Sequence, residues 1–132
     1  MADLINTILI NNKKVEIKNI QHDITLLDWL RNYHKITGTK EGCAEGDCGA
    51  CSVIINKKSK EDSKPINSCL VRLGQVIGCN ITTIEGLGCD KNPHPLQMAF
   101  SNEYASQCGY CTPGFIISGV SLINSGKVIN ND

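Results

Sequence analysis

Residues 38–51 read GTKEGCAEGDCGAC, a stretch with four glycines and three cysteines that favours a loop over a helix or a strand. Cys43, Cys48 and Cys51 follow the pattern C-x4-C-x2-C, and Cys69 comes from a separate segment further along the chain. This spacing is typical of plant-type 2Fe–2S proteins, in which one loop supplies three thiolates and another element supplies the fourth. The sequence therefore predicts a 2Fe–2S cluster on these four cysteines.

Two other kinds of site can be built from cysteines in such a loop. A zinc site usually pairs two short C-x2-C knuckles and needs no C-x4-C step between glycines. A thioredoxin-type dithiol at Cys48 and Cys51 requires a βαβ setting and leaves Cys43 without a role. The loop glycines also allow backbone torsions that bring amide N–H groups close to sulfur, where hydrogen bonds raise a cluster's reduction potential. The 2Fe–2S cluster is favoured over both alternatives.

The composition of the 132-residue chain narrows its class. Thirteen basic and thirteen acidic residues balance, without the basic stripe of a nucleic-acid-binding protein. Eight cysteines could form four disulfides in a secreted protein, but the apolar run at residues 8–10 is too short for a signal peptide. The charge-free stretch 104–126 is densely apolar only over 115–123, too short to cross a membrane. We expect a cytoplasmic protein whose cysteines bind metal or carry out redox chemistry.

The first part of the chain has β-type patterns around one short helix. Asn11 and Asn12 are expected to form a hairpin turn, and Thr25 is the predicted N-cap of a helix that ends before Gly38. Leu26, Leu27, Trp29 and Leu30 of that helix are expected in the core. The predicted strands and returning segments are residues 4–10, 13–17, 52–56, 65–69 and 81–84. Together these elements predict a small mixed sheet that grips a helix.

Helical patterns begin after residue 85. A first helix has its apolar residues at helical spacing, namely Leu96, Ala99, Phe100 and Tyr104. A second helix is predicted at 113–124, with Thr112 as N-cap and Pro113 at the first helical position. It is apolar on most of its circumference and should be buried on more than one side. The preceding CGYC at 108–111 equally suits half a cluster site, a zinc site or a dithiol.

Five motifs occur in order along the chain: TGTKEGCAEGDCGAC (37–51), INSCL (66–70), ITTIEGL (81–87), HPLQ (94–97) and QCGYCTPG (107–114). Together they resemble the iron–sulfur subunit or domain of the molybdenum hydroxylases, and the KEGCAEGDCGAC form leans toward the xanthine dehydrogenase branch. The resemblance covers residues 4 to about 125. It implies an α+β chain, with a β-grasp 2Fe–2S ferredoxin-like domain over 1–85. Residues 86–132 would then form a partial, two-helix version of the family's four-helix bundle.

The resemblance also implies a function in electron transfer. In this family electrons pass from a molybdopterin centre through two 2Fe–2S clusters to FAD or another acceptor. The expected partners are therefore a molybdopterin-binding subunit and an FAD-binding subunit or domain. The chain would be the electron-transfer component of an oxidoreductase, with no bond-making catalysis of its own. Cys108 and Cys111 would be half of the second cluster site, and Gln107 and Cys111 would lie against the molybdopterin.

The sequence departs from the family at its C-terminal end. The family completes its second cluster with a later C-x-C pair, in a motif like CRCTGY, and no such pair occurs before Asp132. Cys79 and Cys89 match no family ligand and are expected to be ordinary buried or surface thiols. His94, at a helix start, is expected to cap or pack rather than to bind metal.

Because only two of the four bundle helices are present, the helix at 113–124 should expose an apolar patch. We expect a partner subunit to cover this patch, with a homodimer through the exposed helix pair as the alternative. Two other functions stay open: a free-standing ferredoxin-like carrier with a vestigial helical part, and a zinc-stabilised interaction module.

Overall fold

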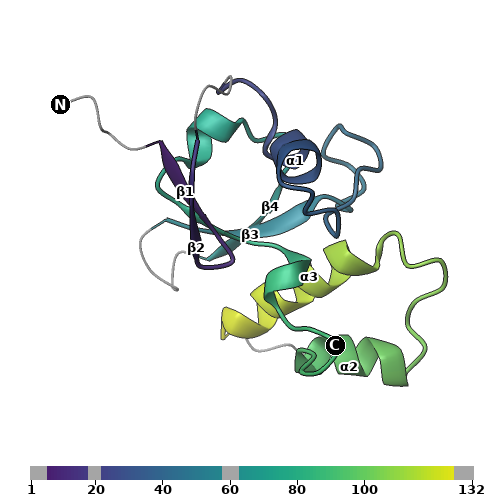
Figure 1. The fold of residues 1–132 in the computed structure, drawn as a ribbon. Coiled ribbons are helices and arrows are strands. Elements are labelled where there is room, and N and C mark those ends of the chain that lie inside the picture. Colours follow the sequence, from purple (N-terminus) through teal and green to yellow (C-terminus); the bar gives the residue numbers. More distant parts are fainter. Residues whose placement is uncertain (1–5, 18–21, 58–62, 127–132) are drawn as a thin grey trace.

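The computed structural model describes residues 6–17, 22–57 and 63–126. These residues contain a mixed sheet of five strands, and Figure 1 shows how the sheet and the helices are arranged. The sheet order is β2-β1-β5-β3-β4, and only the β1–β5 pair is parallel. The strands are β1 (Thr7–Ile10), β2 (Lys13–Glu16), β3 (Ser52–Asn56), β4 (Lys64–Asn67) and β5 (Asn80–Thr82). The helices are α1 (Leu26–Asp28) with its π-helical continuation η1 (Trp29–Tyr33), the 3-10 turns η3 (Leu73–Val76) and η4 (Ile84–Gly86), α2 (Pro95–Asn102) and α3 (Thr112–Asn124).

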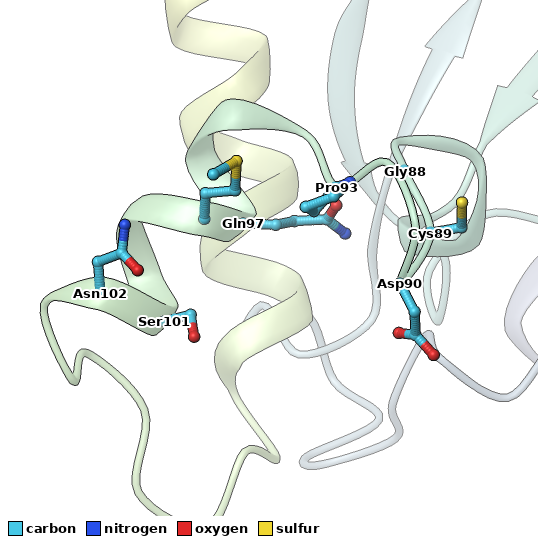
Figure 2. A pocket seen from close by; sticks show the side chains of 8 residues that line it. Gly88, Cys89, Asp90, Pro93, Gln97, Ser101 and Asn102 are labelled. Carbon is cyan, nitrogen blue, oxygen red and sulfur yellow. The ribbon is translucent and has the colours of Figure 1, made fainter.

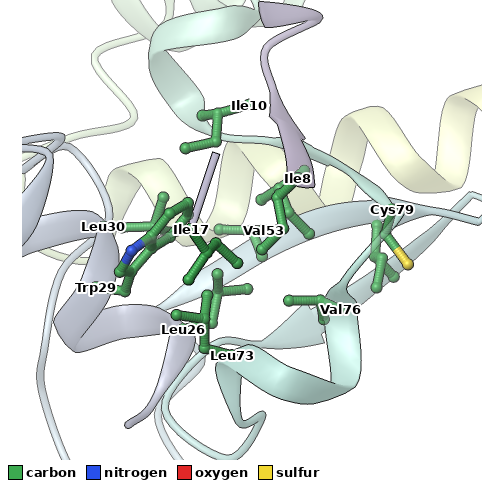
Figure 3. Close-up of a cluster of buried hydrophobic side chains, with 12 residues drawn as sticks. Ile8, Ile10, Ile17, Leu26, Trp29, Leu30, Val53, Leu73, Val76 and Cys79 are labelled. Carbon is green, nitrogen blue, oxygen red and sulfur yellow. The ribbon is translucent and has the colours of Figure 1, made fainter. Parts of the chain in front are cut away.

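Strand β3 is buried on both faces and divides the interior into two cores. Val53 and Ile55 pack into the main core with α1 and η1, where Trp29 is fully buried (Figure 3). Ile54 points to the other face and packs against Ile117 and other residues of α3. A strand covered on both faces has no polar alternation, because every second residue still meets apolar neighbours. This explains the continuous apolar run of β3.

The N-terminal hairpin and the first helix form as the sequence predicts. Asn11 and Asn12 both have positive φ, +50° and +68°, which is the two-residue turn that suits a tight hairpin. Thr25 caps α1, because its hydroxyl accepts a hydrogen bond of 3.1 Å from the Asp28 N–H. Residues 4 and 5 of the predicted first strand lie outside the described residues.

The last strand differs from the prediction of 81–84. Strand β5 spans Asn80–Thr82, and the chain then turns into η4. The Thr83 N–H donates to the side-chain oxygen of Asn11 at 2.9 Å, so a side chain from the hairpin turn takes the place of a neighbouring strand. This side-chain contact, which the strand pattern does not reveal, ends the ladder.

Helix α2 is capped at both ends. His94 acts as its N-cap, as expected, because its Nδ1 accepts from the Leu96 N–H at 3.1 Å. Tyr104 was expected on the helix, but α2 ends at Asn102 and Tyr104 has φ +54° with 91% of its surface exposed. Two hydrogen bonds close a Schellman motif there, Tyr104 N–H to Ser101 O and Ala105 N–H to Phe100 O. The motif reverses the chain and carries Tyr104 away from the apolar face.

Helix α3 begins one residue earlier than predicted. Thr112 is its first residue and Cys111 its N-cap, so Thr112 is not the cap. The Thr112 hydroxyl instead bonds the Ser106 hydroxyl at 2.6 Å and holds the preceding segment to the helix. The inner face of α3 is buried, whereas Phe115, Leu122 and Ile123 remain exposed, as the two-helix arrangement predicts. Within the described ranges no helix is long and apolar enough to cross a membrane.

Candidate metal centre

The cysteine loop, residues 38–51, connects η1 to β3 and is closed at its base. The Lys40 N–H donates to the Ala50 carbonyl at 3.1 Å, which joins the two ends of the loop. Arg31 reaches across from η1, and its Nη1 donates to the carbonyls of Thr37 and Thr39 at 2.9 and 2.8 Å. Arg31 of η1 and the Lys40–Ala50 bond therefore fix the base of the loop. The cysteines lie in the part of the loop beyond this base.

Amide N–H groups surround the first two cysteine sulfurs of this loop. Cys43 Sγ accepts from the amides of Glu45, Asp47 and Cys48 at 3.4, 3.2 and 3.3 Å. Cys48 Sγ accepts from the amides of Cys43 and Ala50, both at 3.4 Å. Such donors stabilise negative charge on sulfur, so the loop is built to hold thiolates.

Two glycines make this wrapping of the backbone feasible. A Cβ on Gly42 would lie 2.7 Å from Cys48 Sγ, and a Cβ on Gly46 would lie 2.3 Å from the Leu70 side chain. Gly46 also has φ +82°, a conformation that favours glycine. The close approach at Gly42 shows that the loop leaves no room beside the sulfur for a further side chain.

The hairpin of β3 and β4 supplies the other two cysteines. Cys51 immediately precedes β3 and Cys69 follows β4, and both are buried against Leu27. Ser68 ties them together, because its hydroxyl donates to the Cys51 carbonyl at 2.7 Å. Asn67 then joins the hairpin to the loop through its side-chain N–H, 3.1 Å from the Gly46 carbonyl. The structure thus joins the hairpin that carries Cys51 and Cys69 to the loop that carries Cys43 and Cys48.

The pKa values of the Cys43 and Cys69 thiols are shifted in opposite directions. The amide groups of Glu45, Cys48 and Asp47 lower the pKa of Cys43 to about 7. Burial raises the pKa of Cys69 to about 11, together with its hydrogen bond to Cys51 and the charges of Cys51 and Cys43. The negative charges of Cys51 and Cys43 thus disfavour the thiolate form of Cys69.

These pKa values predict different alkylation profiles in the metal-free chain, since only the thiolate reacts. A lowered pKa gives thiolate at lower pH, so Cys43 should reach half its maximal rate near pH 7, and Cys69 only near pH 11. Iodoacetamide labelling at stepped pH, resolved by peptide mass spectrometry, measures both. The urea-unfolded chain is the control, and both profiles should converge there. A shared midpoint in the folded chain would contradict the described amide and burial effects.

The donor set fits a two-iron group. Among the residues that the structure describes, no three His, Cys, Asp or Glu side chains are placed to hold a single metal ion. A 2Fe–2S cluster needs four thiolates, which are shared between two irons. The four predicted ligands would supply those thiolates: Cys43 and Cys48, whose sulfurs accept amide hydrogen bonds, and the buried Cys51 and Cys69.

The second cysteine pair lies apart from the sheet, just before α3. Cys108 and Cys111 are both exposed, as is Gln107, and Gly109 between the cysteines has φ +86°. Their exposure leaves all three side chains accessible to another polypeptide.

The remaining cysteines lie elsewhere. Cys79 is buried in the main core, and Cys89 is exposed in a turn closed by its N–H, 3.2 Å from the Asn92 carbonyl. Cys89 lines a pocket of about 380 Å³ between this turn and α2, which Figure 2 shows together with Gln97 and Ser101. None of the predicted ligand residues lines that pocket. These positions agree with the expectation of ordinary thiols.

Three contacts between the cysteine loop and the chain that follows β5 were missed by the sequence interpretation. The Gly38 N–H donates to the Glu85 carboxylate at 2.9 Å, and the Tyr110 hydroxyl donates to the Glu41 carbonyl. Gly114, in the first turn of α3, packs against Gly49, and a Cβ on Gly114 would lie 2.4 Å from the Gly49 carbonyl oxygen. A glycine inside an otherwise apolar helix is a signal of such close backbone approach, and it was available in the sequence.

Comparison with protein families places two 2Fe–2S domains along the chain. Residues 8–80 match the 2Fe–2S iron–sulfur cluster binding domain, and residues 83–132 match the [2Fe–2S] binding domain. Xanthine dehydrogenase of Blastobotrys adeninivorans is 41% identical over 123 residues, which cover 90% of this chain. Mouse xanthine dehydrogenase/oxidase is 40% identical over 120 residues. The chain spans only 9% of the length of these relatives.

Solved structures show the same arrangement. Aldehyde oxidoreductase from Desulfovibrio gigas superposes with a TM-score of 0.84 at 37% identity, over 93% of this chain and 13% of that one. Quinoline 2-oxidoreductase from Pseudomonas putida 86 gives a TM-score of 0.80 at 34% identity, over 91% of this chain and 70% of that one. These likenesses confirm the predicted fold class, a β-grasp ferredoxin-like sheet followed by a two-helix part.

Proposed function

We propose an electron-transfer function for this chain, which belongs to the 2Fe–2S iron–sulfur proteins of the molybdenum hydroxylase family. Cys43, Cys48, Cys51 and Cys69 bind a plant-type 2Fe–2S cluster. When bound, this group accepts and releases one electron at a time. The chain's own residues hold the cluster through four thiolates, and its amide N–H groups stabilise the negative charge on sulfur. The observation that carries this proposal is the set of five amide N–H groups directed at Cys43 and Cys48.

The four cysteines also differ in their exposure to solvent, so the two sides of the site are not equivalent. Cys51 and Cys69 are buried, whereas Cys48 is exposed and Cys43 partly so. Electron transfer is favoured where protein partners approach closely, so the exposed loop is the side on which a partner should dock. The amide hydrogen bonds at that side stabilise the reduced form, because added negative charge on sulfur is favoured by N–H donors.

We propose further that the chain is the electron-transfer part of a larger oxidoreductase of the xanthine dehydrogenase type. A molybdopterin-binding partner supplies electrons and an FAD-binding subunit or domain receives them. Residues 1–85 act as the ferredoxin-like domain and 86–132 as the beginning of the second one. Cys108 and Cys111 contribute two ligands to a second 2Fe–2S cluster, and Gln107 and Cys111 face the molybdopterin. The exposure of these three residues supports a role at an interface.

The exposed face of α3 supports the same proposal. Phe115, Leu122 and Ile123 together give this helix an apolar outer side. An apolar side of this kind marks a protein interface more often than a free surface. We assign it to a partner subunit, with a homodimer of helix pairs as the alternative outcome of a native-mass measurement.

Reconstitution of the purified chain with ferrous iron and sulfide tests the function. We expect about two irons and about two acid-labile sulfides per chain. The cluster should be reduced at a potential of about −400 mV and should then give a plant-type EPR signal. Native mass spectrometry on the same sample gives the oligomeric state. About three irons per chain in a dimer would indicate a second cluster shared between two copies. Zinc uptake without acid-labile sulfide would contradict the proposal and favour a zinc-stabilised interaction module.

A further inference from the structure

We propose that Tyr110 is a positioning residue for the first cluster, acting through its hydroxyl on the backbone of the cysteine loop. This inference rests on the proposed function, because it concerns how the loop that holds the cluster is kept in place. Tyr110 lies inside the CGYC motif of the helical part, and its hydroxyl donates to the carbonyl of Glu41, two residues before Cys43. One hydrogen bond therefore joins the two cysteine motifs directly, across 69 residues of sequence.

The bond is the middle one of three contacts that hold the loop to the chain that follows β5. Glu85 accepts the Gly38 N–H at the beginning of the loop, and the Gly49 carbonyl packs on Gly114 near its end. Between these two points the loop has its own hydrogen bonds, but Glu41 itself is exposed. Tyr110 is thus the contact from the helical part that fixes the loop immediately before its first cysteine.

The position of Glu41 determines where the neighbouring amides point. The Cys43 N–H donates to Cys48 Sγ, and Cys43 Sγ in turn accepts from three amides of the same loop. A loop that is free to move at Glu41 would lengthen some of these bonds. Fewer or longer N–H···S bonds stabilise the reduced cluster less and lower its reduction potential. They also make the cluster easier to release.

The substitution Tyr110→Phe tests this, since it removes the hydroxyl and keeps the ring. Tyr104→Phe is the matched control, because Tyr104 is nearby in sequence and 91% exposed. Wild-type and variant chains, each reconstituted with iron and sulfide, are compared by redox titration and by the rate of cluster loss to a chelator. We expect Tyr110→Phe to have a lower reduction potential and several-fold faster cluster loss, and Tyr104→Phe to match wild type. Circular dichroism of each chain checks that the fold is retained.

Two results would overturn the inference. The first is a Tyr110→Phe chain with the potential and release rate of wild type. The second is an equal change in Tyr104→Phe, which would assign the effect to general loss of a hydroxyl. Failure of the proposed function is seen separately, because it shows already in a wild-type chain that takes up no cluster.

Discussion

Replacing Cys69 with serine is expected to abolish the 2Fe–2S signal of the reconstituted chain. Cys69 is buried behind the loop, and the β3–β4 hairpin fixes its position. A serine hydroxyl is a harder ligand than thiolate and suits iron–sulfur chemistry less well. No spare thiol is placed to substitute, since Cys79 lies in the main core. Iron per chain should fall by more than tenfold, as measured by iron and acid-labile sulfide analysis.

The chain contains its own controls for this experiment. Cys79→Ser and Cys89→Ser remove thiols that lie away from the four converging cysteines and should leave the EPR signal unchanged. Cys48→Ser removes an exposed ligand and should weaken or abolish the signal. An unaltered spectrum in Cys69→Ser would show that the fourth ligand has been assigned wrongly.

Replacing Gly114 with alanine is expected to destabilise the chain by about 1–3 kcal/mol, the usual cost of overpacking. The added Cβ would lie 2.4 Å from the carbonyl oxygen of Gly49, which is backbone and cannot rotate away. Either α3 moves off the sheet or the cysteine loop shifts. Urea unfolding of the variant and wild-type chains measures the difference in the free energy of unfolding.

Ser118→Ala is the matched control for this change. Ser118 is exposed in the middle of the same helix, and alanine has the higher helix propensity, so its stability should equal or slightly exceed that of wild type. Wild-type stability in Gly114→Ala would mean that α3 does not press on the loop as closely as the structure describes.

The sequence predicted the elements whose signals are local. The spacing of Cys43, Cys48 and Cys51 lies within one loop, and the ligand pattern is visible without knowledge of the fold. Thr25 and His94 cap their helices through residues two or three positions away. Local signals of this kind predicted a small mixed sheet around a helix, and the family resemblance implied the fold class, which the solved structures confirm. The assignment of the ligands stays a prediction until iron is measured.

The sequence did not reveal what depends on distant contacts. Strand β5 ends early because the side-chain oxygen of Asn11 accepts the hydrogen bond of the Thr83 N–H, and Asn11 lies 72 residues before Thr83. Tyr104 fits the helical spacing of its neighbours, but a C-terminal cap places it outside the helix. Tyr110 reads as a spacer between two cysteines, and its bond to Glu41 appears only when the helical part is folded against the loop. The bonds of Asn11 and Tyr110 depend on tertiary structure that no residue pattern contains, whereas Tyr104 is placed by local backbone bonds within residues 100–105.

The strand order of the sheet has a consequence for the sequence of events in folding. Cys51 and Ser68 are 17 residues apart and meet through the antiparallel pairing of β3 with β4. The hairpin turn and Thr83 are 72 residues apart and meet only when parallel strands β1 and β5 pair. Short-range closures cost less chain entropy and form sooner than long-range ones. A nascent chain can therefore place its buried cysteine ligands before the sheet that encloses them is complete.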